Sequence, residues 1–149
     1  MSETSVVPPG GYAIKNVQTS NYIVSHSTDK PGSIIRTARR DENGTLPAFT
    51  FYIAQVTLDM EGYYSVTSRL TGLHIGIAQP VGHLPPVEWA PTAQQVAISY
   101  CDGRYIMSLS KGLPPVGHYV CEKGETRELA VSDSLNEAGT EWVLEKVHD

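Results

Sequence analysis

The chain repeats one six-residue pattern, as FYIAQV at residues 51–56, VAISYC at 96–101 and WVLEKV at 142–147. Each copy reads bulky apolar, any residue, Ile or Leu, two further residues, and a final apolar residue. The copies begin at 51, 96 and 142, so they are spaced by 45 and then 46 residues. A period of this size predicts a fold built from similar structural units, here three of them.

A second pattern keeps the same period and reads glycine, any residue, tyrosine, any residue, aliphatic. It begins at Gly10, Gly62 and Gly103, and each time it opens a unit that the six-residue pattern closes. Both patterns place apolar residues at alternate positions, which is typical of strands with one buried face. A unit of roughly 40 to 50 residues has room for about four strands and their turns.

Each unit offers four strand candidates, separated by turn signals such as residues 29–32 (DKPG) and 71–72 (TG). The predicted strands are residues 12–17, 21–25, 33–38 and 49–56, then 63–68, 73–78, 86–90 and 95–100, then 105–109, 117–121, 128–132 and 141–147. No convincing amphipathic helix is found. Ten prolines and thirteen glycines spread among short strands indicate an all-β chain.

Three copies of four strands predict a β-trefoil, in which six strands close a barrel, three hairpins cap one end, and the units are related by pseudo-three-fold symmetry. Closure removes the exposed sheet edges that three separate units would leave. A β-propeller is the alternative geometry, but three blades are too few for it. We expect residues 1–9 to form a flexible lead and residues 10–149 to form a single β-trefoil domain.

Composition excludes several classes of partner. The formal net charge of −5 and the pI of about 5.5 argue against nucleic acid or an anionic membrane surface. No apolar stretch approaches the ~20 residues that span a bilayer, so no membrane insertion is expected. Residues 1–9 have neither the basic region nor the apolar region of a signal peptide, which predicts a cytoplasmic location.

The sequence contains no pattern that predicts catalysis. Phosphate-binding, dinucleotide-binding, HExxH and CxxC motifs are all missing. The five histidines are scattered and indicate no metal site, so we expect no metal and no cofactor. The stretch Ser25-His26-Ser27 is interpreted as a polar loop, because no third residue is indicated to orient the histidine. We therefore expect a binding protein whose function lies in its loops.

Together, the opening and closing patterns resemble those of small fungal β-trefoil proteins from mushrooms, over about residues 10–147. Two groups of these proteins are similar, the lectins, including the ricin-B-like ones, and the protease inhibitors. The final stretch at 142–147 resembles the last strand of mushroom lectins that bind fucosylated core chitobiose. The resemblance implies the β-trefoil fold and a binding function.

The resemblance does not extend to the sugar-binding pattern of ricin-type lectins. That pattern has Gln-x-Trp in each repeat and an Asp near the second strand. This chain has Phe51 and Val96 where two of the tryptophans belong, and it keeps Trp142 but has Thr140 in place of the glutamine. Ser25 replaces the Asp of the first unit. A repeated galactose site of the ricin type is therefore not predicted.

A different sugar site would still pair an aromatic ring with polar groups that fix the sugar hydroxyls. Two sets of residues have this composition, one in the second unit and one in the third. The set in the third unit lies where the resemblance places the chitobiose site. The sets are Trp89, Glu88 and His74 in the second unit, and His118, Tyr119, Glu122 and Asn136 in the third. For Trp89 and Tyr119 the alternative is that they are core aromatic residues.

The first hypothesis for function is a lectin-like carbohydrate-binding protein without catalytic activity, whose ligand is a glycan. The alternative is a protease inhibitor that acts through an exposed surface loop, with a protease as partner. A third possibility is a subunit that binds another protein. Candidate inhibitor residues are Lys30, Arg69, Lys111, Lys123 and the loop at 80–86.

Overall fold

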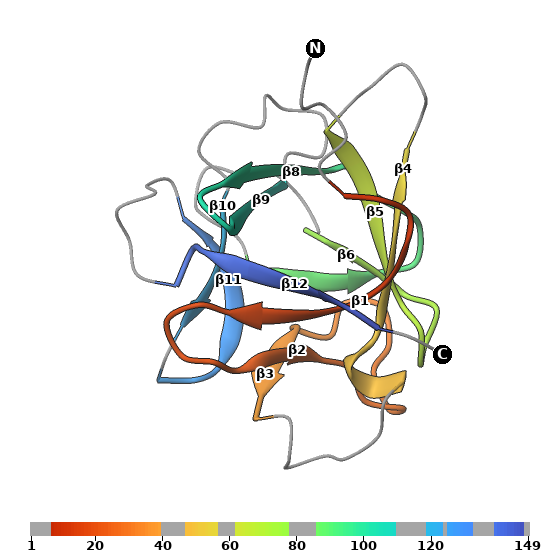
Figure 1. Cartoon of the computed structure of the whole chain (residues 1–149). Helices are drawn as coiled ribbons and strands as arrows, with labels where there is room; N and C mark the ends of the chain where they lie inside the picture. The colour runs from red at the N-terminus through yellow and green to blue at the C-terminus, as the bar shows by residue number, and fades with distance from the viewer. Residues whose placement is uncertain are drawn as a thin grey trace.

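A computed structural model describes residues 7–39, 47–56, 62–77, 86–109, 119–123, 125–132 and 139–147. These ranges contain twelve strands and one short 3-10 helix, η1 (Pro47–Phe49), and no helix in them is long and apolar enough to cross a membrane. All twelve predicted strands are confirmed, with bounds shifted by a few residues (Figure 1). They are β1 (Gly10–Asn16), β2 (Tyr22–Val24), β3 (Arg36–Ala38), β4 (Phe51–Gln55), β5 (Tyr63–Ser68), β6 (His74–Gly76), β7 (Glu88–Ala90), β8 (Val96–Cys101), β9 (Arg104–Leu109), β10 (Tyr119–Lys123), β11 (Glu128–Ser132) and β12 (Trp142–Lys146).

Six of the strands close into a barrel. β1 pairs with β4, β4 with β5, β5 with β8, β8 with β9, β9 with β12, and β12 returns to β1, always antiparallel. In this circuit Ile14 lies opposite Leu144, and Ile53 lies opposite Val66. Because the circuit is complete, none of the six strands is left at an edge.

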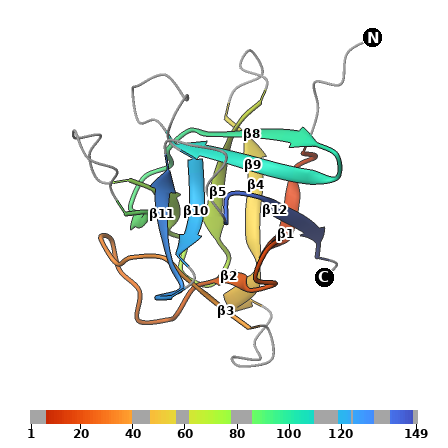
Figure 2. The same cartoon turned by 90° about the vertical axis from the view of Figure 1, so that its left-hand side faces the viewer.

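The other six strands form three hairpins, β2–β3, β6–β7 and β10–β11. Figure 2 labels the first and the last of these hairpins. Three backbone hydrogen bonds join the hairpins in a ring. The amide of Ile35 donates to the carbonyl of Val87 (3.0 Å), that of Val87 to Leu129 (3.2 Å), and that of Leu129 back to Ile35 (2.8 Å). A six-stranded barrel with three hairpins joined in this cyclic way is a β-trefoil, as the sequence predicted.

The residues of the closing pattern form the shared core. Phe51, Val96 and Trp142 are its first positions, and all three are fully buried. Two positions further on, Ile53 and Ile98 are also buried, as strand alternation requires. The repeat therefore serves the core of the fold.

The opening pattern also has a structural role. Gly62 and Gly103 have φ angles of 86° and 82°, a left-handed region that favours glycine. The tyrosines that follow gather at one end of the barrel. Burial raises the pKa of Tyr12 and of Tyr105, and the charge that each would carry is further disfavoured by neighbouring tyrosines, including Tyr64.

The end of the predicted flexible lead packs on the barrel. Val7 is buried, and its amide donates to the Tyr64 hydroxyl at 3.3 Å. The Tyr12 hydroxyl donates to the carbonyl of Pro8 at 2.6 Å. Residues 7–9 are thus attached to the domain, whereas residues 1–6 lie outside the described residues.

Candidate functional site

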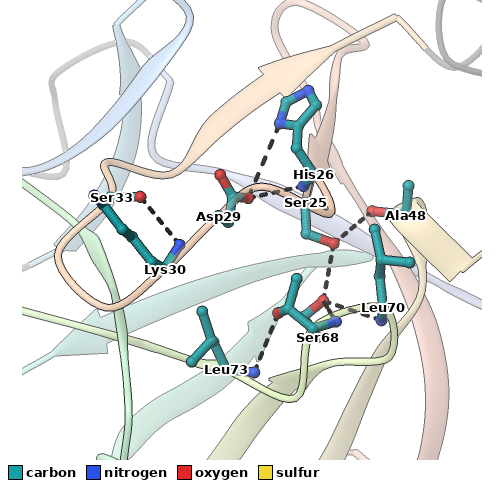
Figure 3. Close-up of polar contacts among 10 residues, drawn as sticks. Ser25, His26, Asp29, Lys30, Ser33, Ala48, Ser68, Leu70 and Leu73 are labelled. Atoms are coloured by element: carbon teal, nitrogen blue, oxygen red, sulfur yellow. Dashed lines mark hydrogen bonds and ion pairs between the residues drawn. The ribbon is translucent and has the colours of Figure 1, made fainter.

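Ser25 occupies the position at which the ricin-type pattern has its Asp, and it is buried. Its hydroxyl donates to the Ala48 carbonyl at 3.2 Å and accepts from the Ser68 hydroxyl at 2.8 Å. Figure 3 shows these contacts on one side and His26 on the other, with the His26 ring 3.9 Å from the Asp29 carboxylate. Ser25 and His26 therefore form no nucleophile–base pair, which agrees with their interpretation as part of a polar loop.

Ser68 also organises the turn that follows β5. Its hydroxyl oxygen accepts hydrogen bonds from the amides of Leu70 and Thr71, both at 3.2 Å. The amide of Arg69, between them, donates to the carbonyl of Thr50 at 3.0 Å. These bonds fix the backbone from which the Arg69 side chain extends.

Glu122, predicted as a sugar ligand, is a buried residue of β10 and is only 4% exposed. One carboxylate oxygen accepts from the Thr19 hydroxyl at 2.6 Å. The other accepts from the Asn21 amide and from the Thr37 hydroxyl, both at 2.8 Å. All three donors come from the first unit, so Glu122 ties the third unit to it and offers no open face to a ligand.

Trp89, predicted as a sugar platform, is a core residue and is 1% exposed. Its ring stacks on that of Phe51, with centroids 5.9 Å apart. Glu88 precedes it on β7 and is half-buried on the opposite face of the strand. Both residues line a small hollow of about 280 Å³, yet the burial of Trp89 leaves no ring face for a sugar. The structure thus supports the alternative, in which Trp89 packs in the core.

His74, the third residue predicted in this set, lies on β6 opposite Ala90, while Ile75 lies opposite Trp89. Its ring Nδ1 is 2.9 Å from the hydroxyl of Thr67. Burial lowers the pKa of His74 below its ordinary value. His74 is therefore on the outer face and is not brought together with the Trp89 ring.

Of the set predicted in the third unit, the structure describes Tyr119 and Glu122. Tyr119 is half-buried at the start of β10, opposite Ser132 in β11 and Ser108 in β9. Residues three apart on a strand point to opposite faces, so Tyr119 does not share a site with the Glu122 carboxylate. His118 and Asn136 lie outside the described residues.

A larger groove, of about 480 Å³, lies over the neighbouring strands β12, β1, β4 and β5. We call it the Tyr52 groove, because Tyr52 lines it and is 52% exposed. Tyr52 lies opposite Gly11 on one side and Thr67 on the other, and Thr67 lies opposite His74. The lining residues are Gly10, Gly11, Thr50, Tyr52, Thr67, Ser68, Arg69, Lys146 and Val147.

The groove is hollow beside Tyr52 because the facing residue of β1 is a glycine, Gly11. Gly11 is the neighbour of Tyr52 across the sheet, and a β-carbon added to it would come 3.3 Å from the methyl group of Thr50. A β-carbon on Gly10 would collide with the side chain of Lys146. The missing side chain of Gly11 leaves a trough beside Tyr52, whereas the corresponding space at Gly10 is filled by the Lys146 side chain.

Two cations are among the described residues that line the groove. Arg69 and Lys146 are the charged members of its lining. The Lys146 ammonium lies 5.0 Å from the centroid of the Tyr12 ring and 3.4 Å from the carbonyl of Pro9. The groove thus combines an open aromatic ring, hydroxyl groups and two cations.

Tyr52 is not among the predicted site residues, although its position in the closing pattern carries a signal of exposure. Phe51 and Ile53 are buried, so alternation places Tyr52 on the outer face of the barrel. An aromatic residue at such a position is exposed unless a loop covers it. Arg69 was considered only as a protease-facing residue.

The candidate inhibitor residues show no shared geometry. Lys30 is exposed in a loop where its amide donates to the Ser33 hydroxyl at 3.2 Å. Lys123 is exposed at the end of β10, whereas Lys111 and residues 80–85 lie outside the described residues. No observation on the described part of the chain supports a protease as the partner.

Comparison with known proteins finds likeness in fold but not in sequence. No family model and no curated protein matches the chain. The agglutinin of Rhizoctonia solani matches with a TM-score of 0.78 and 14% identity, over 95% of this chain and 97% of that one. The Macrolepiota procera ricin B-like lectin, solved in complex with lactose, matches with a TM-score of 0.76 and 11% identity, over 97% and 100%.

A third match lies within an enzyme. The GlcNAcα1-4Gal-releasing endo-β-galactosidase of Clostridium perfringens matches with a TM-score of 0.73 and 14% identity, over 93% of this chain but 32% of that one. At these identities the likeness concerns the fold alone. The chain has the fold of the fungal β-trefoil lectins, and the resemblance seen in its sequence is confirmed at that level.

Proposed function

We propose that this protein is a lectin-like carbohydrate-binding protein that holds a glycan in the Tyr52 groove and does not transform it. The observation that carries the proposal is the exposed Tyr52 side chain beside the trough left by Gly11. An aromatic face of this kind binds the apolar side of a sugar ring, while nearby polar groups bind its hydroxyls.

The other properties of the groove agree with such a ligand. Its volume of about 480 Å³ lies within the range of about 300–1,000 Å³ that is usual for small-molecule sites. Thr67 lines it opposite Tyr52, and its hydroxyl lies 2.9 Å from the ring Nδ1 of His74. Polar groups that are already oriented lose little freedom on binding.

The proposal gives the protein a single site of this kind. Tyr52 is the second residue of the closing pattern, and the corresponding residues of the other units are Ala97 and Val143. Neither side chain can provide an aromatic platform. The pseudo-symmetry of the core is therefore not matched by a three-fold set of sugar sites.

Binding without catalysis is supported by the chemistry of the lining. Glycoside hydrolysis normally needs a pair of carboxyl groups on either side of the scissile bond. The nine described residues that line the Tyr52 groove include neither Asp nor Glu. Their aromatic, hydroxyl and cationic groups can hold a sugar, but they provide no general acid paired with a general base.

A glycan array tests the proposal, followed by titration calorimetry on the best ligand. We expect Tyr52→Ala to abolish binding while leaving the thermal unfolding temperature unchanged within a few degrees. The matched control is Tyr100→Ala, because Tyr100 is 53% exposed and lies outside the groove. The proposal fails if no glycan binds, or if binding survives Tyr52→Ala. If Tyr119→Ala abolishes binding and Tyr52→Ala does not, the glycan site lies in the third unit and not in the Tyr52 groove.

A further inference from the structure

The sign of the charge in the Tyr52 groove is opposite to that of the whole chain. The sequence has 16 acidic residues against 11 Lys and Arg. The described residues that line the groove nevertheless include two cations, Arg69 and Lys146, and no carboxylate. A local field that differs from the global charge attracts a ligand of the opposite sign.

Lys146 lines the groove, and no carboxylate of the described residues is paired with its ammonium. A carbonyl oxygen at 3.4 Å and the Tyr12 ring at 5.0 Å orient the ammonium without neutralising it. The adjacent carboxylate, Glu145, lies on the face of the sheet that carries Tyr52, because its partner Ala13 alternates with Gly11, the partner of Tyr52, but it is not among the described residues that line the groove. It lies 3.8 Å from the Lys15 ammonium and accepts a hydrogen bond from the Tyr22 hydroxyl at 3.0 Å.

Arg69 flanks the groove on the side away from Lys146. The strands run in the order β12, β1, β4, β5, so Lys146 extends from one outer strand and Arg69 from the turn that follows the other. The amide of Arg69 is bonded to Thr50, and Ser68 holds the turn. Tyr52 lies on β4 between the two cations.

We infer that the Tyr52 groove binds a saccharide that carries an acidic group, either a carboxylate or a sulfate. The inference rests on the proposed function and specifies its ligand class. The sugar ring stacks on Tyr52, and the acidic group pairs with Arg69, Lys146 or both through charge-assisted hydrogen bonds. Arg suits such a role because its planar guanidinium can donate two parallel bonds to a carboxylate or a sulfate.

Four probes test the inference by titration calorimetry: lactose, 3′-sulfated lactose, 3′-sialyllactose and a hyaluronan tetrasaccharide. The sulfated and carboxylated probes show which acidic group is preferred. We expect at least one acidic probe to bind more tightly than lactose, and to bind more weakly as NaCl rises from about 50 to 300 mM.

The variants are Arg69→Gln and Lys146→Gln, with Arg36→Gln and Lys15→Gln as controls because they remove cations outside the groove. Each groove variant should lower the affinity for the acidic probe by about tenfold, as expected for loss of one charge-assisted hydrogen bond. Binding of lactose should not change, and neither control should have an effect.

Two results overturn the inference. One is that none of the acidic probes binds more tightly than lactose. The other is that both groove variants bind the acidic probes as the wild type does. If a neutral glycan still binds and is lost in Tyr52→Ala, the proposed function stands without the acidic preference. If the glycan array is empty, the proposed function fails as well.

Discussion

The Asn21 amide donates a 2.8 Å hydrogen bond to the Glu122 carboxylate, although the two residues are 101 positions apart in the sequence. Thr19 and Thr37 donate to the same carboxylate. A carboxylate from the third unit is thus satisfied by three uncharged donors of the first. The contact joins two units of the trefoil through side chains as well as through the barrel.

Glu122→Ala should destabilise the domain strongly. The substitution leaves three donors without their acceptor in the interior, and we expect the free energy of unfolding to fall by about 2–4 kcal/mol. Urea denaturation measures the change. Glu125→Ala is the control, because Glu125 is exposed in the turn before β11, and it should change stability by no more than about 0.5 kcal/mol. Equal effects of the two substitutions would contradict this account.

The two buried tryptophans provide a matched pair. The Trp142 Nε1 donates to the carbonyl of Val120 at 3.0 Å, whereas the Trp89 Nε1 is buried without a partner in the part of the chain that the structure describes. Replacement by Phe removes the same atoms at both sites. We expect Trp142→Phe to cost about 1–2 kcal/mol more than Trp89→Phe, because only the former leaves an acceptor unpaired. Denaturation of the two variants measures the difference. If Trp89→Phe lowered the free energy of unfolding more than Trp142→Phe does, packing and not the hydrogen bond would determine the difference.

Gly11→Val should fill the trough beside Tyr52. The added side chain would occupy the space between β1 and Thr50, where a β-carbon already lies 3.3 Å from the nearest methyl group. Glycan affinity should fall by at least about tenfold, while the domain stays folded by circular dichroism. Ala97→Val is the control, because Ala97 corresponds to Tyr52 in the second unit. Normal binding by Gly11→Val would exclude the trough as the site.

His74 should make stability depend on pH. Burial lowers its folded-state pKa below the ordinary value of 6.5, so the unfolded chain takes up a proton more readily. The free energy of unfolding should therefore decrease as the pH falls through 6.5, and the decrease should level off below the folded-state pKa. His74→Gln should flatten this part of the curve in denaturation between about pH 4.5 and 7.5. Identical curves for the two proteins would contradict the assignment to His74.

The fold could be predicted because its determinants are local. Alternation within six residues identifies a strand, and the recurrence of Phe51, Val96 and Trp142 identifies three units. The groove could not be predicted in this way, since it combines four strands and depends on the absence of a side chain at Gly11. Trp89 illustrates the same limit: its burial follows from stacking on Phe51, a contact that no spacing in the sequence reveals.

The pairing of β12 with β1 has a consequence for the biosynthesis of the protein. β1 is made early, but its partner over Tyr12 to Asn16 is the last strand of the domain. Until residues 142–146 have left the ribosome, β1 and β9 each present unpaired backbone groups to other chains. We expect the nascent chain to need shielding during this interval, and to complete its barrel only after release of the final strand.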